Sequence, residues 1–380
     1  MEKALREERA RREEASLQRE LRWLDDTQGT DVVWEGRRLI NFSSNDYLGL
    51  AKHPKLKAAA IEATDRWGTG SGGARLVCGT LPVHRELEAT IAKFKGTQAA
   101  LTFSSGYAAA IGTICALVGS GDVVIVDKLV HASLVDGARL SGAKLRVFRH
   151  NDVEDLKRIL QWARSAIDST KRILIVTESV FSMDGDCAPL RQIVELKEQF
   201  GAWLMVDEAH ALGVLGPGRR GLAEELGIAN QIEIQMGTLG KAVGSVGGFI
   251  AGSQTLIDHL INSARSFIFS TAPGPAAVAS ARTGIELIAS KEGETLRAKL
   301  LKIISALAPS HDAKTAIIPI ILGSEERALA AANKLKNEGF LVPAIRYPTV
   351  PRGKARLRVT LSAAHTPDQI AKLSAALAAL

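Results

Sequence analysis

The chain has 380 residues, of which 46% are hydrophobic and 23% are charged, and its formal net charge is +7. This length accommodates one large α/β domain and a smaller one. No apolar run approaches the ~18 residues that a membrane-spanning helix needs. The three cysteines share no metal-ligand spacing, which argues against a zinc site or a disulfide framework and predicts reduced thiols. The positive charge is spread along the chain, so it suits an acidic small molecule or carrier protein as well as nucleic acid.

Residues 1–25 mix Arg, Lys and Glu with few apolar positions, which predicts a solvent-exposed helix. Their early glutamates and lack of an apolar segment argue against a targeting peptide, so we expect a cytoplasmic protein. Residues 32–34 and 38–42 have the pattern of two short strands around Glu35-Gly36, a hairpin signal. We therefore expect a helical arm and a hairpin over residues 1–45.

Residues 46–284 have the pattern of a large α/β domain. Helices are expected at 55–67 and 86–95, and strands then alternate with helices from about 99 to 250. The expected strands are 99–103, 123–126, 173–177, 203–206 and 232–236, with a helix at 190–200. Such alternation predicts a parallel sheet that is flanked by helices.

Residues 285–380 have a different pattern, which predicts a smaller α+β domain. The expected elements are helices 285–307 and 325–338, strands 317–322, 340–345 and 355–362, and a final helix that begins at Thr366-Pro367. In strand 355–362, apolar residues alternate with Arg356 and Arg358. This alternation predicts a strand with one face in water.

Reactive side chains follow two of the strands of the large domain. Asp207 and His210 come after strand 203–206, and Lys241 follows strand 232–236 among glycines. In an open parallel sheet, ligands bind at the carboxyl ends of the strands. A lysine held in a cleft there can form a Schiff base with a carbonyl cofactor, and an aspartate can pair with the protonated nitrogen of a pyridine ring. The spacing of Asp207 and Lys241 suggests such a pair but does not establish it.

Three further features have both a functional and an ordinary explanation. Strand 99–103 leads into Gly106-Tyr107 and a helix, which can aim free N–H groups at a phosphate or form a helix start without a ligand. His131 follows strand 123–126 and could stack on a flat ring, although a single histidine is more often structural. Arg346 lies in a proline-rich loop, where it is either a clamp for a carboxylate or a surface arginine.

Two short motifs point to nucleotide binding, and their context argues against both. Residues 68–73 satisfy G-x-G-x-x-G, but a charged helix precedes them where a dinucleotide site has a strand. Residues 207–210 spell the DEAH box of helicases, but no phosphate-binding loop precedes them. A catalytically silent scaffold is disfavoured because Asp207, His210 and Lys241 are all present.

The chain resembles the α-oxoamine synthases, a branch of the fold-type I pyridoxal-phosphate enzymes, over nearly its whole length. The matching stretches are NFSSNDYLGL (41–50), GSGGARLVCGT (70–80), HASLVDGARLSGA (131–143), HNDVEDL (150–156), TESVFSMDGD (177–186), VDEAHALG (206–213), GTLGKAVG (237–244) and ARLRVTLSAAHT (355–366). The resemblance implies a mainly parallel seven-stranded sheet with flanking helices, a small α+β C-terminal domain, and a homodimer with active sites at the subunit interface.

The resemblance also implies roles for the residues around the ring of pyridoxal 5'-phosphate. Lys241 would be the Schiff-base lysine and the acid–base group, and Asp207 would pair with the ring nitrogen. His210 would bond the ring oxygen, His131 would stack on the ring and contact the substrate, and Ser182 would approach the ring.

Other residues are implied at the phosphate and the substrate. The backbone at Gly106 and Tyr107 and the hydroxyl of Thr238 would hold the phosphate, and Thr271 would reach the phosphate of the neighbouring subunit. The implied substrate residues are Arg346 for the amino-acid carboxylate, Thr349, and Arg19, for which Arg22 is an alternative.

The implied reaction is the decarboxylative condensation of L-alanine with a pimeloyl thioester of coenzyme A or acyl carrier protein, which belongs to biotin synthesis. The loop 345–351, the segment 150–153 and the lack of long extensions favour this branch of the family. A glycine-using synthase that takes acetyl-CoA, a 5-aminolevulinate synthase and a sphingolipid-type synthase would share the cofactor residues, so all three stay open. No partner among nucleic acids or membranes is implied.

Overall fold

The computed structural model describes residues 1–168, 170–308 and 314–380. Contacts divide the chain into two compact units, which are described separately. The large unit comprises residues 48–182 and 186–298, and the small unit comprises residues 1–47, 183–185 and 299–380. Within the described ranges, no helix combines the length and the apolar character that a membrane crossing requires.

The large unit is built on a seven-stranded sheet with the order β4-β10-β9-β8-β7-β5-β6. Its strands are β4 (Ala99–Phe103), β5 (Val123–Asp127), β6 (Lys144–Phe148), β7 (Ile173–Glu178), β8 (Trp203–Asp207), β9 (Ile234–Thr238) and β10 (Gly248–Gly252). Only β10 runs antiparallel to its neighbours in this sheet. The predicted fold, a mainly parallel seven-stranded sheet, is thereby confirmed.

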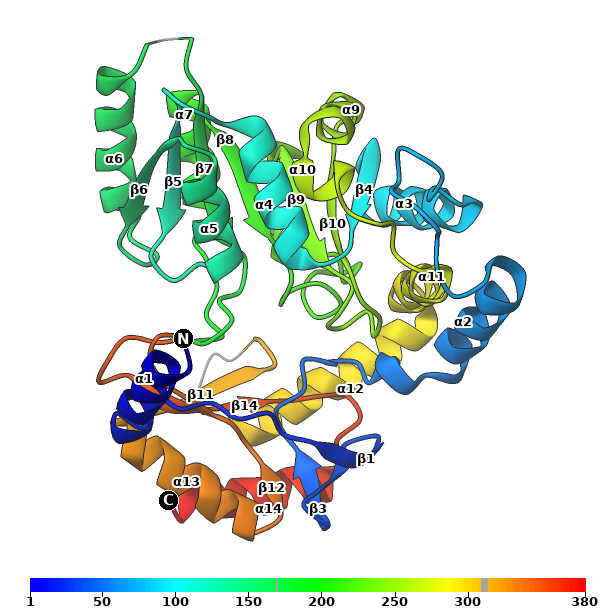
Figure 1. Cartoon of the computed structure of the whole chain (residues 1–380), viewed down its shortest axis with the longest axis vertical. Coiled ribbons are helices and arrows are strands. Elements are labelled where there is room, and N and C mark those ends of the chain that lie inside the picture. The colour runs from blue at the N-terminus through cyan, green and yellow to red at the C-terminus, as the bar shows by residue number, and fades with distance from the viewer. Residues whose placement is uncertain (169, 309–313) are drawn as a thin grey trace. The chain divides into compact units, whose positions relative to one another are not determined.

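Helices of the large unit surround this sheet (Figure 1). They are α2 (Pro54–Trp67), α3 (Pro82–Lys95), α4 (Gly106–Leu117), α5 (Ala132–Leu140), α6 (Val153–Ala166), α7 (Leu190–Phe200), α8 (Leu222–Glu225), α9 (Gln254–Ser263), α10 (Arg265–Ile268) and α11 (Pro275–Ala289), with 3-10 turns at Leu50–Lys52 and Ala229–Gln231. Strands β5, β7 and β10 are buried along their whole length. Apart from Asp127 at the end of β5 and Thr177 and Glu178 at the end of β7, their sequences lack polar side chains, as expected for strands covered on both faces.

The described residues of the small unit form two sheets. One has the order β1-β2-β3-β12 (Leu24–Gln28, Asp31–Trp34, Arg37–Asn41 and Phe340–Leu341), and the other has the order β11-β14-β13 (Ile317–Gly323, Ala355–Thr360 and Ala344–Ile345). The predicted hairpin is confirmed, because β2 pairs with β3 across Glu35 (φ 53°) and Gly36 (φ 70°). Two positive φ angles are typical of a type I′ turn.

Three helices among the described residues belong wholly to the small unit. They are α1 (Glu2–Glu14), α13 (Glu325–Asn337) and α14 (Pro367–Ala378), whereas α12 (Lys291–Leu307) crosses the division at residue 298. The predicted start of α14 is confirmed, since Thr366 and Gln369 form a capping box. The prediction of one helix over 1–25 is wrong, because α1 ends at Glu14 and β1 begins at Leu24.

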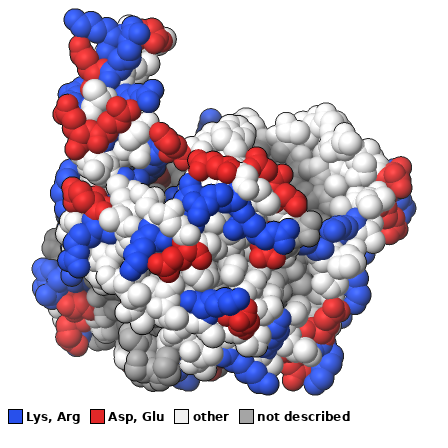
Figure 2. Space-filling model, turned by 90° about the horizontal axis from the view of Figure 1, so that it is seen from below, with Lys and Arg blue, Asp and Glu red and all other residues white. Residues whose placement is uncertain are grey.

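Figure 2 shows acidic and basic side chains interspersed on one face, in keeping with a charge spread along the chain.

The units differ from the predicted domains (1–45, 46–284, 285–380) in two respects. The N-terminal 47 residues fall in the same unit as the C-terminal segment. In addition, the predicted helix 285–307 is two helices, and the first of them, α11, packs on α2 and α3 within the large unit. The large unit therefore extends to residue 298.

The predicted wet face of strand 355–362 is wrong. Arg356 is 3% exposed and Arg358 is 5% exposed. The guanidinium group of Arg356 donates to Asp184 Oδ1 at 2.5 Å and to the main-chain oxygen of Met183 at 3.2 Å. The guanidinium group of Arg358 donates to Asn45 Oδ1 at 3.1 Å. These partners replace water, so both charges can be buried.

Candidate active site

The carboxyl ends of β7, β8 and β9 bring several polar groups to one edge of the sheet. Glu178 ends β7 and is the register partner of Asp207, which ends β8. Asp207 is in turn the partner of Met236 in β9. Lys241 comes three residues after the end of β9. As predicted, these strand ends lie together, so an aspartate and a lysine are found at the same edge of the sheet.

Lys241 lies next to His210. Lys241 Nζ and His210 Nε2 are 2.8 Å apart, which is a hydrogen-bond distance. His210 is 6% exposed. This hydrogen bond orients the lysine side chain that a carbonyl cofactor would meet.

Asp207 is a buried carboxyl group whose charge is only partly compensated. Burial raises its pKa, and the charge of Lys241 and a hydrogen bond from the main-chain N–H of Ala209 (2.9 Å) oppose this effect. A cation that enters the site beside Asp207 would stabilise its carboxylate. The protonated nitrogen of a pyridine ring is such a cation.

His131 precedes the first turn of α5 and caps it. Its Nδ1 accepts a hydrogen bond from the main-chain N–H of Ser133 at 3.2 Å and lies 2.8 Å from the Ser133 hydroxyl. Loss of surrounding water lowers the pKa of His131, and the charge of Lys241 lowers it further, against the effects of Asp207 and Asp136. The ring is therefore neutral near pH 7, which suits a ring that stacks on another flat ring.

The start of α4 lies against the end of β9. Ser105 caps α4 by accepting from the N–H of Ala108 at 3.0 Å. A Cβ built on Gly106 would lie 3.7 Å from the Cβ of Thr238, so these two residues are neighbours. Thr238 donates its hydroxyl proton to the main-chain oxygen of Gly247 at 3.0 Å. The N-terminus of a 12-residue helix beside a threonine hydroxyl suits a phosphate group.

Tyr107, Ser182 and Thr271 were also predicted at the cofactor. Tyr107 is 48% exposed and donates its hydroxyl proton to Asp136 Oδ2 at 2.8 Å. Ser182 is buried, and its main-chain N–H donates to Glu178. Thr271 is exposed and forms an isolated bridge with Ala74. Their predicted roles stay predictions.

Three of the predicted substrate residues, Arg19, Arg346 and Thr349, lie in the small unit, whereas His131 lies in the large unit. Arg346 donates to the main-chain oxygens of Ser16 and, at 3.2 Å, Gln18. Arg19 donates to the hydroxyl of Thr349 at 3.4 Å. Burial lowers the pKa of Arg346, and the neighbouring charges of Arg19 and Arg22 lower it further. A cluster of three guanidinium groups would favour an anion.

Arg22, the alternative to Arg19, has a different neighbour. Its guanidinium carbon lies 5.5 Å from the centre of the Trp34 ring. Arg19, by contrast, contacts Thr349, another predicted substrate residue. The contacts therefore favour Arg19 as the substrate arginine, and the assignment stays a prediction.

Two residues near this edge had no predicted role. Glu178 is 2% exposed and lies beside Asp207. His150 lies between Asp127 Oδ1 (2.9 Å) and Asp186 Oδ2 (2.7 Å), and although burial lowers its pKa, these hydrogen bonds raise it to about 10. Glu178 is the last residue of β7 and His150 comes two residues after β6, and neither position reveals the partners in the sequence.

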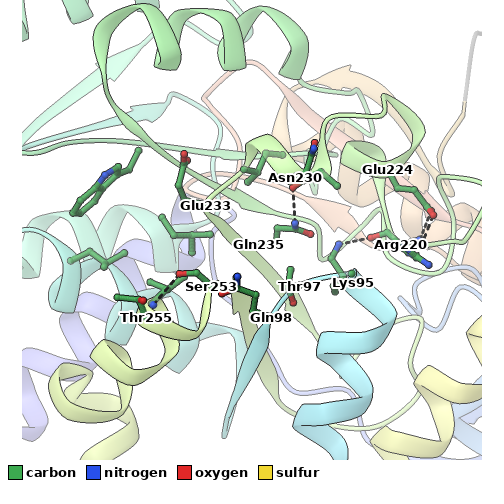
Figure 3. A pocket seen from close by; sticks show the side chains of 18 of the residues that line it. Lys95, Thr97, Gln98, Arg220, Glu224, Asn230, Glu233, Gln235, Ser253 and Thr255 are labelled. Atoms are coloured by element: carbon green, nitrogen blue, oxygen red, sulfur yellow. Dashed lines mark hydrogen bonds and ion pairs between the residues drawn. The ribbon is translucent and has the colours of Figure 1, made fainter.

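A cavity of about 910 Å³ lies at the opposite edge of the sheet (Figure 3). Its wall includes Trp203 and Ile234, the first residues of β8 and β9, together with Gln235 and Lys95. The lining contains neither Lys241 nor Asp207. The cavity is thus separate from the reactive groups at the carboxyl ends.

In the described part of the chain, no group of three His, Cys, Asp or Glu side chains is placed to hold a metal ion.

The sheet with a lysine and an aspartate at its carboxyl edge is the architecture of the aminotransferase class I and II family. That family matches residues 37–377, and the chain belongs to it. The chain is 50% identical over 373 residues to 8-amino-7-oxononanoate synthase of Geobacter sulfurreducens, covering 96% of this chain and 94% of that protein. It is 48% identical over 376 residues to the same enzyme of Alkalilimnicola ehrlichii, covering 97% and 95%.

Solved structures show the same relationship. Serine palmitoyltransferase from S. paucimobilis, with bound PLP and myriocin, matches with a TM-score of 0.92 at 32% identity and covers 99% of this chain and 96% of its own. 8-Amino-7-oxononanoate synthase of Francisella tularensis matches with a TM-score of 0.75 at 29% identity and covers 90% and 98%. The resemblance that the sequence motifs indicated is confirmed.

Proposed function

We propose that the chain is a pyridoxal 5'-phosphate enzyme that condenses L-alanine with a pimeloyl thioester, giving 8-amino-7-oxononanoate, carbon dioxide and a free thiol for biotin synthesis. The observation that carries the proposal is the edge of the sheet where Lys241, His210 and Asp207 meet. The 50% identity to a synthase of this name over 373 residues supports the choice of reaction.

The residues present fit this cofactor. Asp207 is a buried acid whose carboxylate a cationic ring nitrogen would stabilise. His131 offers a neutral ring, and the start of α4 with Thr238 offers donors for a phosphate. When bound, pyridoxal phosphate supplies an electron sink that stabilises negative charge on the α-carbon of the amino acid.

The side chains of the protein supply binding and proton transfer. Lys241 would hold the cofactor through its aldehyde and, once displaced by the amino acid, would take the proton from the α-carbon. Asp207, as an anion, would keep a proton on the ring nitrogen. His210, 2.8 Å from Lys241 Nζ, would keep the amine oriented.

The substrate carboxylate would be bound by Arg346 through charge-assisted hydrogen bonds. Arg19 and Thr349 would contact the acyl substrate, which arrives on coenzyme A or on acyl carrier protein. We further propose a homodimer in which Thr271 reaches the cofactor phosphate of the neighbouring subunit. The cytoplasm is the proposed compartment, because all three cysteines are free thiols.

A spectral titration tests the proposal. Purified protein is loaded with pyridoxal phosphate and titrated with L-alanine or glycine, and pimeloyl-CoA or acetyl-CoA is then added. We expect L-alanine to shift the visible band and only the pimeloyl thioester to release a thiol, with 8-amino-7-oxononanoate identified by mass spectrometry. Productive turnover of glycine with acetyl-CoA would instead assign the chain to the 2-amino-3-oxobutyrate branch, and the proposed reaction would be wrong.

A further inference from the structure

Glu178 is a buried acid that the proposed reaction leaves without a role. It is 2% exposed and occupies the last position of β7. Its register partner on the adjacent parallel strand is Asp207. Two carboxyl groups at neighbouring strand ends repel each other when both are ionised, so their burial together needs a physical reason.

The contacts of Glu178 supply one. The main-chain N–H of His131 donates to Glu178 Oε1, and the main-chain N–H of Ser182 donates to the same carboxyl group. His131 follows β5 and Ser182 follows β7. One carboxyl group therefore ties together two loops, and each loop carries a side chain assigned to the cofactor ring.

We propose that Glu178 is a positioning residue that holds the main chain of His131 and Ser182 at the cofactor ring and leaves Asp207 as the one carboxylate of the pair. The inference rests on the cofactor residues of the proposed function. It adds to them a residue that need not touch the cofactor.

The electrostatics of the pair agree with this role. Burial raises the pKa of Glu178 to about 8 and the charge of Asp207 adds to this effect, whereas Lys241 and the two N–H donors oppose it. Glu178 is therefore mostly protonated at pH 7. Asp207 itself faces His131, Lys241 and Glu208. Above pH 8 the site gains a second negative charge, which would favour the protonated, cationic form of the bound cofactor.

Two substitutions separate the two parts of the role. Glu178→Gln keeps an acceptor for the N–H of His131 and removes the ionisable group, whereas Glu178→Ala removes both. For Glu178→Ala we expect at least tenfold weaker binding of pyridoxal phosphate and a smaller visible circular dichroism signal, because the ring is less well fixed. For Glu178→Gln we expect binding within about threefold of wild type.

The pH titration of the visible absorption band tests the charge. At pH 7 the visible band of Glu178→Gln should match that of wild type, because Glu178 is already mostly protonated there; above pH 8 only the wild type gains a negative charge, so the two titrations should diverge. Asp155→Asn is the matched control. Asp155 is also buried and accepts a main-chain N–H, that of Arg149 at 2.9 Å, so this variant should lower the melting temperature and leave the cofactor signals unchanged.

The outcomes are distinguishable. If Glu178→Ala melts earlier but binds the cofactor with the wild-type dissociation constant and dichroism, Glu178 is merely structural and the inference is overturned. A visible band of Glu178→Gln that already differs from wild type below pH 7 would show that Glu178 is a second carboxylate there, which overturns the inference even if the alanine variant does not fold. If wild-type protein forms no visible band with pyridoxal phosphate, the proposed function fails first, whatever the Glu178 variants do.

Discussion

Replacing Gly248 by alanine should weaken the binding of pyridoxal phosphate. Gly248 begins β10, and a Cβ at this position would lie 2.6 Å from both the Cα of Gly106 and the main-chain oxygen of Ser105. Real Cβ contacts are essentially never shorter than 3.0 Å. The neighbours are backbone atoms, so the clash can be relieved only if the start of α4 or the strand itself moves.

The size of the effect follows from two costs. Overpacking a close backbone contact costs about 1–3 kcal/mol of unfolding free energy. If the displaced helix start loses one hydrogen bond to the phosphate, binding weakens by about 1.5–3 kcal/mol, since the acceptor is charged. That loss corresponds to roughly a tenfold to hundredfold rise in the dissociation constant.

The assay is a fluorescence titration of the apoprotein with pyridoxal phosphate, together with thermal melts of the apo and loaded forms. Gly119→Ala is the control, because Gly119 lies just beyond the other end of α4 and its added Cβ would meet only the main-chain oxygen of Ser141, at 3.9 Å. The control should bind normally. A Gly248→Ala protein that also binds normally would show that the start of α4 is not part of the phosphate site.

Three further outcomes are expected. Lys241→Ala should abolish turnover and leave pyridoxal phosphate bound only non-covalently, so that borohydride no longer fixes it to the protein in a mass spectrum; normal turnover would remove the central assignment. Arg346→Ala should weaken L-alanine binding by about 1.5–3 kcal/mol in the spectral titration, and an unchanged affinity would mean that another residue holds the carboxylate. His150, whose pKa rises from 6.5 to about 10 between Asp127 and Asp186, should stabilise the fold fully below pH 6.5 and lose that contribution as the pH rises towards 10. Denaturant melts across this range should therefore show a steeper loss for wild type than for His150→Gln, and equal slopes would contradict the assigned charge.

Most of the large unit could be predicted from the sequence because its central strands are buried on both faces. The expected strand 99–103 and helix 190–200 coincide with β4 and α7. The edge strand β6 was not predicted, since its sequence KLRVF mixes charged and apolar residues and it has a neighbour on one side only. Strand β10 was not predicted either, because its sequence GFIAG stands among glycines and serines that resemble a continuation of the loop after Lys241.

The candidate site was predictable to the extent that strand direction determines it. Parallel strands bring their carboxyl ends to one edge, so an aspartate and a lysine that each follow such a strand are expected to meet. The 2.8 Å contact between His210 and Lys241 depends on the path of two loops, which periodicity does not describe. The substrate roles of the residues in the small unit were predicted through resemblance, since a single arginine in a loop carries no signal of its own.

The buried arginines of β14 show where reasoning from a pattern ends. An alternating strand indicates two faces of different polarity, but it does not indicate whether water or another segment covers the polar face. The acid that pairs with Arg356 is 172 positions away in sequence, and the amide that meets Arg358 is 313 positions away. Glu178 is the same case, because its surroundings come from the loop after β5, its own loop and the end of β8. A charged residue in a strand therefore indicates that its side chain either faces water or meets a polar partner far away in the sequence. Which of the two applies depends on whether another segment covers that face of the strand.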